Sequence, residues 1–266
     1  MSLVFAAVCP HPPLLIPAIG EGKGMEYLKK TKAGFETLEQ ELYLSKPNLI
    51  VIISPHEGIY EDVFVVNAHT EFVSDYTNFG DVVTKDTWIG EPSIAAKISH
   101  AGHENESSLP VRLMSETKLS HGTAIPLHFL TAHLPEVKIL PIGFSNRSRE
   151  DHKNFGIFLK DILMNTDKRV AVIASGDLAH CLTKDAPAGL DEQGSTFDRE
   201  IIAALEAGDT DKILSIDQEK IDRAKECGYR SLLILLGILD DNKHEFKKIS
   251  YEYPFGVGYL VGNFVF

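Results

Sequence analysis

The sequence predicts an α/β protein, a single domain in which a central, mostly parallel or mixed sheet is flanked by helices. Short apolar segments rich in β-branched residues alternate along the chain with longer amphipathic segments, as in sheets whose strands are joined by helices. Two of the apolar segments, Leu49–Ser54 and Val170–Ser175, show no alternation with polar residues, which is typical of strands buried on both faces. Since no repeat, low-complexity tract or linker interrupts residues 1–266, we expect one domain over that whole range.

The individual elements follow from these two patterns. The apolar runs predict strands over Leu3–Val8, Leu49–Ser54, Val63–Asn67, Lys138–Gly143, Val170–Ser175 and Gly258–Phe266. The amphipathic stretches predict helices over Met25–Leu44, Ser93–His100, Ala124–His133, Asp151–Met164, Phe197–Ala207 and Tyr229–Leu239. The turn-rich segment Glu71–Glu91 and the polar segment Ala101–Pro110 are expected to be excursions above the sheet, where substrate loops are often found.

Composition and charge exclude several classes of function. Lys and Arg total 26 against 38 Asp and Glu, a formal charge of −12, and an anionic surface repels phosphate backbones and acidic lipid headgroups. We therefore expect no nucleic-acid partner and no membrane partner. Three cysteines are too few for a disulfide scaffold of this length, and the apolar start has no Lys or Arg before Lys23, unlike a signal peptide. A cytoplasmic protein is the resulting expectation.

Three predicted strands, the first, second and fifth, are each followed closely by a histidine. These residues are His11, His56 and His180. In open α/β sheets ligands bind at the edge formed by the carboxyl ends of the strands, so the three imidazoles are expected to converge there. The alternative is three loop histidines that stabilise turns. Three histidines that each follow the end of a strand favour the functional interpretation.

The other histidines carry weaker signals. His121 precedes a predicted helix and, taken alone, is expected to be a turn residue ahead of an N-cap at Thr123. His100 and His103 have a spacing that could hold a metal ion on a helix, but their position beside a polar segment favours a solvated loop. The remaining histidines are expected to be surface or packing residues; they are His69, His128, His133, His152 and His244.

A carboxylate would complete a metal site with two of these imidazoles. Two histidines and one carboxylate with open positions are the ligand set of non-haem Fe(II) oxygenases. Glu226, just before the apolar helix Tyr229–Leu239, is the candidate, but spacing alone favours one more charged residue that extends the run from Asp217 to Lys225. Asp177 could orient His180 or cap the next turn, and capping is the expected role.

Each of the three cysteines stands beside a candidate residue. A thiolate with two imidazoles would suit zinc or copper, whereas a free cysteine is more often a small apolar packing residue. Packing is the expectation for Cys9 and Cys181, and the role of Cys227 stays open.

Taken together, these motifs resemble the class III extradiol ring-cleavage dioxygenases, catalytic B-subunit (LigB-like) family, in a branch related to the Memo-like proteins. The motifs that carry the resemblance occur in this order: Cys9-Pro10-His11-Pro12-Pro13-Leu14-Leu15, Ile53-Ser54-Pro55-His56, Ser120-His121-Gly122-Thr123, Ser175-Gly176-Asp177-Leu178-Ala179-His180 and Pro254-Phe255-Gly256-Val257-Gly258-Tyr259. The resemblance spans His11 to Tyr259, which is nearly the whole chain.

The resemblance implies a role for each residue that matches a motif. His11 and His56 match the two iron-binding histidines, His180 the acid–base histidine, and His121 a second catalytic histidine that holds substrate and oxygen. The third ligand in the dioxygenases is a late glutamate, for which Glu226 is the match. In Memo-like proteins a cysteine serves at this place, and here Cys227 is adjacent, so the third ligand stays open. Glu57, directly after His56, is an additional carboxylate that could join the site.

The function implied is a non-haem Fe(2+)-dependent extradiol dioxygenase that opens the ring of a catechol-like aromatic with O₂. In such a reaction Fe(II) lowers the pKa of the catechol hydroxyls, His180 takes a proton, and His121 stabilises negative charge on oxygen. One alternative is a Memo-like metal-binding protein or partner subunit without ring-cleaving activity. Another is a zinc hydrolase that uses the same histidines. A homo-oligomer or an accessory subunit that closes the pocket is left open.

Overall fold

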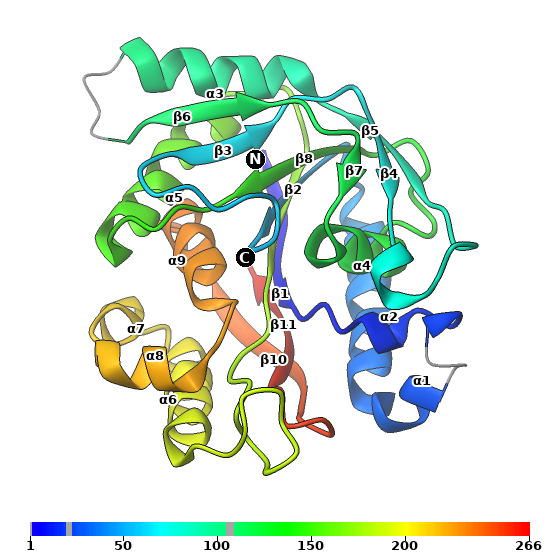
Figure 1. The fold of residues 1–266 in the computed structure, drawn as a ribbon. Helices are drawn as coiled ribbons and strands as arrows, with labels where there is room; N and C mark the ends of the chain where they lie inside the picture. The colour runs from blue at the N-terminus through cyan, green and yellow to red at the C-terminus, as the bar shows by residue number, and fades with distance from the viewer. Residues whose placement is uncertain (1, 20–22, 105–108) are drawn as a thin grey trace.

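The computed structural model describes residues 2–19, 23–104 and 109–266, and within these residues eleven strands form one mixed sheet (Figure 1). The strands are β1 (Leu3–Cys9), β2 (Leu49–Ser54), β3 (Phe64–Asn67), β4 (Glu71–Ser74), β5 (Thr87–Gly90), β6 (Val111–Met114), β7 (Lys118–Leu119), β8 (Lys138–Gly143), β9 (Val170–Ser175), β10 (Glu245–Glu252) and β11 (Tyr259–Val265). The main path runs β10-β11-β1-β9-β2-β8-β5-β4-β7, and β3 pairs with β6 and β8 beside it.

The centre of the sheet is parallel and its margins are mixed. β9 lies between β1 and β2 and pairs in parallel with both, and β2 pairs in parallel with β8. β11 runs antiparallel to β1 and to β10. β2 and β9 are buried along their whole length, as their uninterrupted apolar sequences predicted, because helices cover both faces. Three parallel strands therefore end side by side at one edge.

Helices cover both faces of the sheet. They are α1 (Lys23–Tyr27), α2 (Lys29–Ser45), α3 (Pro92–Glu104), α4 (His121–Leu130), α5 (Arg149–Met164), α6 (Glu192–Ala207), α7 (Thr210–Leu214), α8 (Gln218–Ala224) and α9 (Tyr229–Ile238), with short 3₁₀ turns at Pro13–Leu15 and Thr77–Phe79. Figure 1 shows α1, α2 and α4 on one side of the central strands and α3, α5 and α9 on the other. Alternate residues of each central strand enter two separate cores: Val51 and Ile53 of β2 join one, and Ile50 and Ile52 the other.

The predicted fold class and all six predicted strands are confirmed. The long helix predicted over Met25–Leu44 is interrupted at Leu28, which separates α1 from α2. The helix predicted from Ala124 begins three residues earlier, and its N-cap position is Ser120 rather than Thr123. The prediction that segment Glu71–Glu91 only rises above the sheet was wrong, since it contributes β4 and β5.

The segment Ala101–Pro110 was also expected to be a loop. Its first part instead continues helix α3 to Glu104, so that His100 and His103 lie on a helix. Residues 105–108 of this segment lie outside the described residues. Both histidines are exposed, and neither belongs to a potential metal-binding group found in the described part of the chain.

No helix in the described ranges 2–19, 23–104 and 109–266 combines the length and the apolar character needed to cross a membrane.

Candidate metal centre and active site

The ends of β1, β9 and β2 bring the candidate residues together. The register pairs Cys9 of β1 with Ser175 of β9, so the two strands end level with each other. His11 follows β1 by two residues, and His56 follows β2 by two residues. A third strand end, that of β9, leads into Asp177 and His180. This is the convergence that the three strand-end histidines predicted.

Two imidazole nitrogens and one sulfur face a common point. Nε2 of His11 lies 3.2 Å from Nε2 of His56 and 3.6 Å from Sγ of Cys227. Atoms bound to one ion at about 2.0–2.3 Å are themselves a little over 3 Å apart in tetrahedral geometry. The spacing of the three donor atoms therefore fits a shared transition-metal ion. Their side chains form one of two potential metal-binding groups found among the described residues.

A hydroxyl fixes the tautomer of His11. Oγ of Ser175 donates its hydrogen to the backbone carbonyl of Gly122 at 2.5 Å and lies 3.0 Å from Nδ1 of His11. A hydroxyl has one hydrogen, so it accepts from Nδ1–H of the imidazole. The lone pair of His11 is then on Nε2, the atom that faces His56 and Cys227, as a metal ligand requires.

Asp177 connects His11 to the loop that carries Cys227. Its Oδ1 accepts the backbone N–H of His11 at 3.0 Å, and its backbone carbonyl accepts the N–H of Cys227 at 3.2 Å and of Gly228 at 2.9 Å. Its own N–H donates to Sγ of Cys227 at 3.3 Å. Asp177 was expected to cap a turn, but it holds two ligand candidates from distant parts of the chain in one place.

Two glycines allow these loops to approach each other. A Cβ on Gly176 would clash with Cα of Gly228, so the backbones after β9 and before α9 are in direct contact. The loop that carries Cys227 is thereby held against the end of β9. Any side chain at Gly176 would push the loops apart.

His180 lies beside the three converging donors and forms the second potential metal-binding group with Asp177 and Cys227. Its Nε2 is buried and has no hydrogen-bond partner among the described residues. Desolvation lowers the pKa of His180, against the opposing effect of the Asp177 charge. The imidazole is therefore neutral at pH 7, with a buried nitrogen available to a ligand or a transferred proton.

His121 is the first residue of α4 and completes a cluster of rings. It stacks on His56 with ring centroids 4.3 Å apart, and the ring of Phe79 meets it edge-on at 5.0 Å. Burial, followed by the charges of His11 and His56, lowers the pKa of His121 to about 3. His121 is thus a neutral ring packed against both histidines that face the shared point, since its centroid also lies 5.3 Å from that of His11.

Glu57 holds the start of α4 and does not join the metal-binding groups found among the described residues. Its Oε1 accepts the backbone N–H of Ser120 at 3.0 Å and the hydroxyl of Ser120 at 2.7 Å. Burial raises the pKa of Glu57. The carboxyl therefore fixes the residue that precedes His121.

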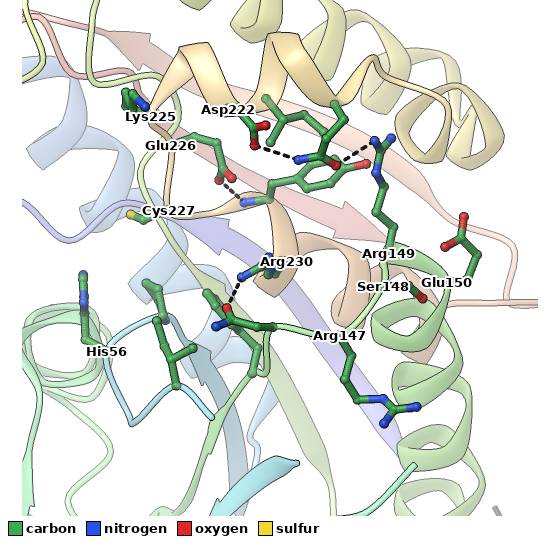
Figure 2. A pocket seen from close by; sticks show the side chains of 17 residues that line it. His56, Arg147, Ser148, Arg149, Glu150, Asp222, Lys225, Glu226, Cys227 and Arg230 are labelled. Carbon is green, nitrogen blue, oxygen red and sulfur yellow. Dashed lines mark hydrogen bonds between the residues drawn. The ribbon is translucent and has the colours of Figure 1, made fainter. Parts of the chain in front are cut away.

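Glu226 points away from the two imidazole nitrogens. Its Oε2 accepts the backbone N–H of Tyr229 at 2.6 Å, so it satisfies a free donor at the start of α9 (Figure 2). Burial raises the pKa of Glu226 to about 7. It belongs to neither potential metal-binding group in the described residues, whereas Cys227, one residue later, belongs to both.

Burial favours the neutral forms of the two imidazoles and of the thiol. Desolvation lowers the pKa of His56 and lowers that of His11 well below its usual value. The same cause raises the pKa of the Cys227 thiol well above its usual value. Neutral imidazoles are the form that binds metals, and a bound cation would deprotonate the thiol.

A pocket of about 680 Å³ opens beside these residues (Figure 2). His56, Cys227 and Glu226 line one part of it, and most of the rest is lined by the segment between β8 and α5, by helix α8 and by the starts of α5 and α9. A volume of this size accommodates a small aromatic molecule. The metal-binding group is therefore accessible from a cavity large enough for a substrate.

The remaining histidines have structural partners, as expected. The buried His152 lies within hydrogen-bond distance of the carbonyls of Ser148 and Ser145. His128 lies 2.9 Å from Asp86, and His133 lies 2.8 Å from Glu39. His69 and His244 lie within hydrogen-bond distance of backbone carbonyls. Cys9 and Cys181 are buried, consistent with packing roles.

Sequence reasoning missed Ser175 and Phe79, and it favoured a capping role for Asp177. Ser175 and Asp177 lie in the same motif as His180, so their position at the end of a buried strand was a usable signal. The ring of Phe79 comes from a turn whose sequence gives no sign that it reaches His121.

The chain matches one protein family and one curated relative over nearly its whole length. The family described as "Catalytic LigB subunit of aromatic ring-opening dioxygenase" matches residues 5–262. Protein CA_C1420 of Clostridium acetobutylicum is 30% identical over 269 residues, covering 98% of this chain and 57% of that protein. The chain thus spans little more than half the length of this relative.

Two further proteins are similar. The 4,5-DOPA dioxygenase extradiol of Mirabilis jalapa is 26% identical over 200 residues, covering 71% of this chain and 72% of that protein. The crystal structure of the uncharacterized protein JW3007 from Escherichia coli K12 superimposes with a TM-score of 0.65 at 16% identity, over 99% of this chain and 100% of that chain. At that identity the superposition shows a shared fold.

Proposed function

Since the chain belongs to the family of catalytic LigB subunits of aromatic ring-opening dioxygenases, we propose that it is a non-haem Fe(II)-dependent extradiol-type dioxygenase acting on a catechol-like aromatic. One observation carries the proposal. Nε2 of His11, Nε2 of His56 and Sγ of Cys227 converge beside a substrate-sized pocket that His56 and Cys227 line, and Nε2 of His180, near Cys227, has no partner among the described residues.

The proposed ligands are His11, His56 and one residue from the loop before α9. Glu226 was the expectation from the sequence, and a carboxylate would give the usual ligand set of Fe(II) oxygenases. The proposal favours Cys227 as the third ligand, because its sulfur lies 3.6 Å from Nε2 of His11 while the Glu226 carboxylate is bonded to the Tyr229 N–H. A rotation of Glu226 toward the imidazoles would have to break that bond.

The chemistry assigned to the protein is positioning and proton transfer. An Fe(II) ion held there would lower the pKa of catechol hydroxyls and provide the binding place for O₂. Neutral His180 accepts the proton from a catechol hydroxyl at its unpartnered Nε2 and returns it after the ring opens. His121, which stacks on His56, donates a hydrogen bond to negative charge that develops on oxygen.

A second candidate function is supported by the same cysteine. In a Memo-like metal-binding protein without ring-cleaving activity, a cysteine takes the place of the carboxylate. Cys227 belongs to both potential metal-binding groups in the described residues, and that observation favours this candidate. The two candidates share a pocket and differ in whether bound iron supports oxygen chemistry.

The deciding experiment measures O₂ consumption by protein loaded with Fe(II) without oxygen and then mixed with a panel of catechols. The dioxygenase proposal expects uptake with a ring-opened product, and loss of both in His180→Ala. Iron bound in stoichiometric amount with no uptake for any catechol would favour the second candidate. Turnover that persists with zinc and without O₂ would instead indicate a hydrolase.

A further inference from the structure

The pocket beside the metal-binding group is lined by more cations than anions, although the whole protein is strongly acidic. Four cationic side chains and three carboxylates line it; they are Arg147, Arg149, Lys225 and Arg230, against Glu150, Asp222 and Glu226. The chain as a whole has a formal charge of −12. A local excess of positive charge in such a protein is typical of a place where an anionic group binds.

Two of the three arginines are already held by the protein. Arg149 donates to the backbone carbonyls of Leu214, at 2.9 Å, and of Ile216, and to Oε1 of Gln218 at 2.8 Å. Arg147 pairs with the carboxylate of Asp151 at 3.1 Å, four residues along α5. Each of these two guanidiniums therefore already has at least two partners, since Arg147 also donates to the carbonyl of Asp62.

Arg230 has fewer hydrogen bonds to the protein than either Arg147 or Arg149. Its Nη1 donates to Oδ1 of Asn146 at 2.9 Å, and its guanidinium carbon lies 5.6 Å above the ring of Phe144. Among the described residues no carboxylate lies within ion-pair distance of it. Asn146 and Phe144 fix the plane of the guanidinium, and its remaining N–H donors have no hydrogen-bond partner in the described part of the chain.

Arg230 is near Cys227 of the metal-binding group in the sequence and shares a pocket with it. It lies on the first turn of α9, three residues after Cys227, and it lines the same pocket as His56 and Cys227. Figure 2 shows Arg230 in the middle of the lining residues, with His56 and Cys227 to one side and Arg147 and Arg149 to the other. The guanidinium and two of the ligand candidates, His56 and Cys227, therefore line one cavity.

We propose that Arg230 binds a carboxylate on the substrate, so that the preferred substrates are catechols that carry an acidic side chain. This inference rests on the proposed function and deepens it by assigning a specificity-determining residue. A planar guanidinium with a free edge matches a carboxylate through two parallel hydrogen bonds.

The neighbouring acids argue against an anion of higher charge. Glu150, Asp222 and Glu226 line the same pocket, and a fourth carboxylate, that of Asp151, already pairs with Arg147. These carboxylates repel an incoming anion, and the repulsion is greater for a phosphate dianion than for a singly charged carboxylate. The recognised group is therefore a single carboxylate.

The test compares two catechols that differ only in charge, 3,4-dihydroxyphenylpropionate and its primary amide. Their dissociation constants are measured by titration calorimetry without oxygen on Fe(II)-loaded protein, for the wild type and for Arg230→Met. We expect the wild type to bind the acid at least about tenfold more tightly than the amide, the size of a charge-assisted hydrogen bond. Arg230→Met is expected to remove that difference and to leave the affinity for the amide within about threefold.

Two further variants control for charge and for folding. Arg147→Met removes the same charge from the same pocket, but from a guanidinium already paired with Asp151, so it is expected to keep the preference for the acid. Arg230→Lys keeps the charge and loses the planar fork, and it is expected to keep part of the preference. A thermal unfolding curve establishes that each variant is folded before it is titrated.

The outcomes separate this inference from the proposed function. Equal binding of acid and amide by a wild type that opens catechol rings overturns the role of Arg230 and leaves the dioxygenase in place. A preference for the acid that survives in Arg230→Met, or that Arg147→Met removes equally, also overturns it. Absence of both binding and O₂ uptake for every catechol overturns the proposed function and this inference together.

Discussion

The hydroxyl of Ser175 stands 3.0 Å from Nδ1 of His11 and donates its own hydrogen to the carbonyl of Gly122. This contact holds the imidazole in the tautomer whose Nε2 carries a lone pair. Ser175 is not itself a proposed ligand, so this contact can be removed while every proposed ligand stays in place.

Ser175→Ala is therefore expected to weaken metal binding without abolishing it. Loss of a partner that orients a ligand histidine typically lowers metal affinity by about 10- to 100-fold. Competition of the variant against a chelator of known affinity measures the change. Unchanged affinity would show that the tautomer of His11 is fixed by something else.

His11→Ala and His56→Ala are each expected to abolish stoichiometric metal binding, because each removes one of the converging nitrogens. Metal content after dialysis against a defined Fe(II) or Zn(II) concentration is the measurement. His133→Ala is the matched control, since this exposed histidine has Glu39 as its partner far from the site. Full affinity in either site variant would show that the metal binds elsewhere.

The adjacent pair Glu226 and Cys227 gives a direct comparison of the two candidates for the third ligand. Cys227→Ser is expected to lower metal affinity by at least about tenfold, since a hydroxyl replaces a thiolate. Glu226→Gln is expected to leave the affinity unchanged, because its amide oxygen still accepts the N–H of Tyr229. The reverse order of effects in the same chelator competition would identify Glu226 as the ligand.

His180→Ala is expected to retain the metal and lose turnover. Removal of a general acid–base group typically lowers the rate by about 10²- to 10⁴-fold. Metal content and O₂ uptake measured on the same sample separate the two effects. Loss of metal in this variant would place His180 among the ligands, together with Asp177 and Cys227.

Asp198 is expected to make stability fall as the pH rises from about 4 to 6. Its carboxyl is buried, accepting the N–H of Ala179 at 2.9 Å and the hydroxyl of Tyr251 at 2.6 Å. Burial raises the pKa of Asp198 to about 6, above the value of about 3.9 in an unfolded chain. The folded state therefore binds the proton more tightly, and this contribution to stability is complete below pH 4 and lost above pH 6.

The matched variant is Asp198→Asn, which cannot titrate. Its free energy of unfolding, relative to that of the wild type, is expected to rise by up to about 3 kcal/mol between pH 4 and pH 7. Urea unfolding at a series of pH values gives the difference. A difference that stays constant across this range would show that Asp198 does not couple to folding.

The central sheet could be predicted from the sequence because β2 and β9 are continuous apolar runs, and such runs have few alternative structures. β7 was missed because two residues carry no periodicity, and β10 because its exposed lysines obscure the alternation of an edge strand. The predicted helix Ser93–His100 ends too early because the last turn of α3, which reaches Glu104, is polar and resembles a loop in the sequence.

The histidine cluster was predictable for a related reason. A histidine directly after a parallel strand has a known position, so His11, His56 and His180 could be placed together before the structure was known. The hydrogen-bond partner of Glu226 could not be predicted in this way. Its bond with the N–H of Tyr229, three residues later, depends on where helix α9 begins. Sequence spacing alone leaves a capping carboxylate and a metal ligand indistinguishable.

The contact between Gly176 and Gly228 has a consequence for how this chain tolerates mutation. Neither glycine can take part in chemistry, yet an alanine at Gly176 has no room beside Cα of Gly228. A saturation library screened for metal retention should therefore be as intolerant at Gly176 as at the histidines. A variant that loses the metal through such a substitution would still carry every donor atom, but the donor atoms would no longer be at the spacing that a shared ion requires.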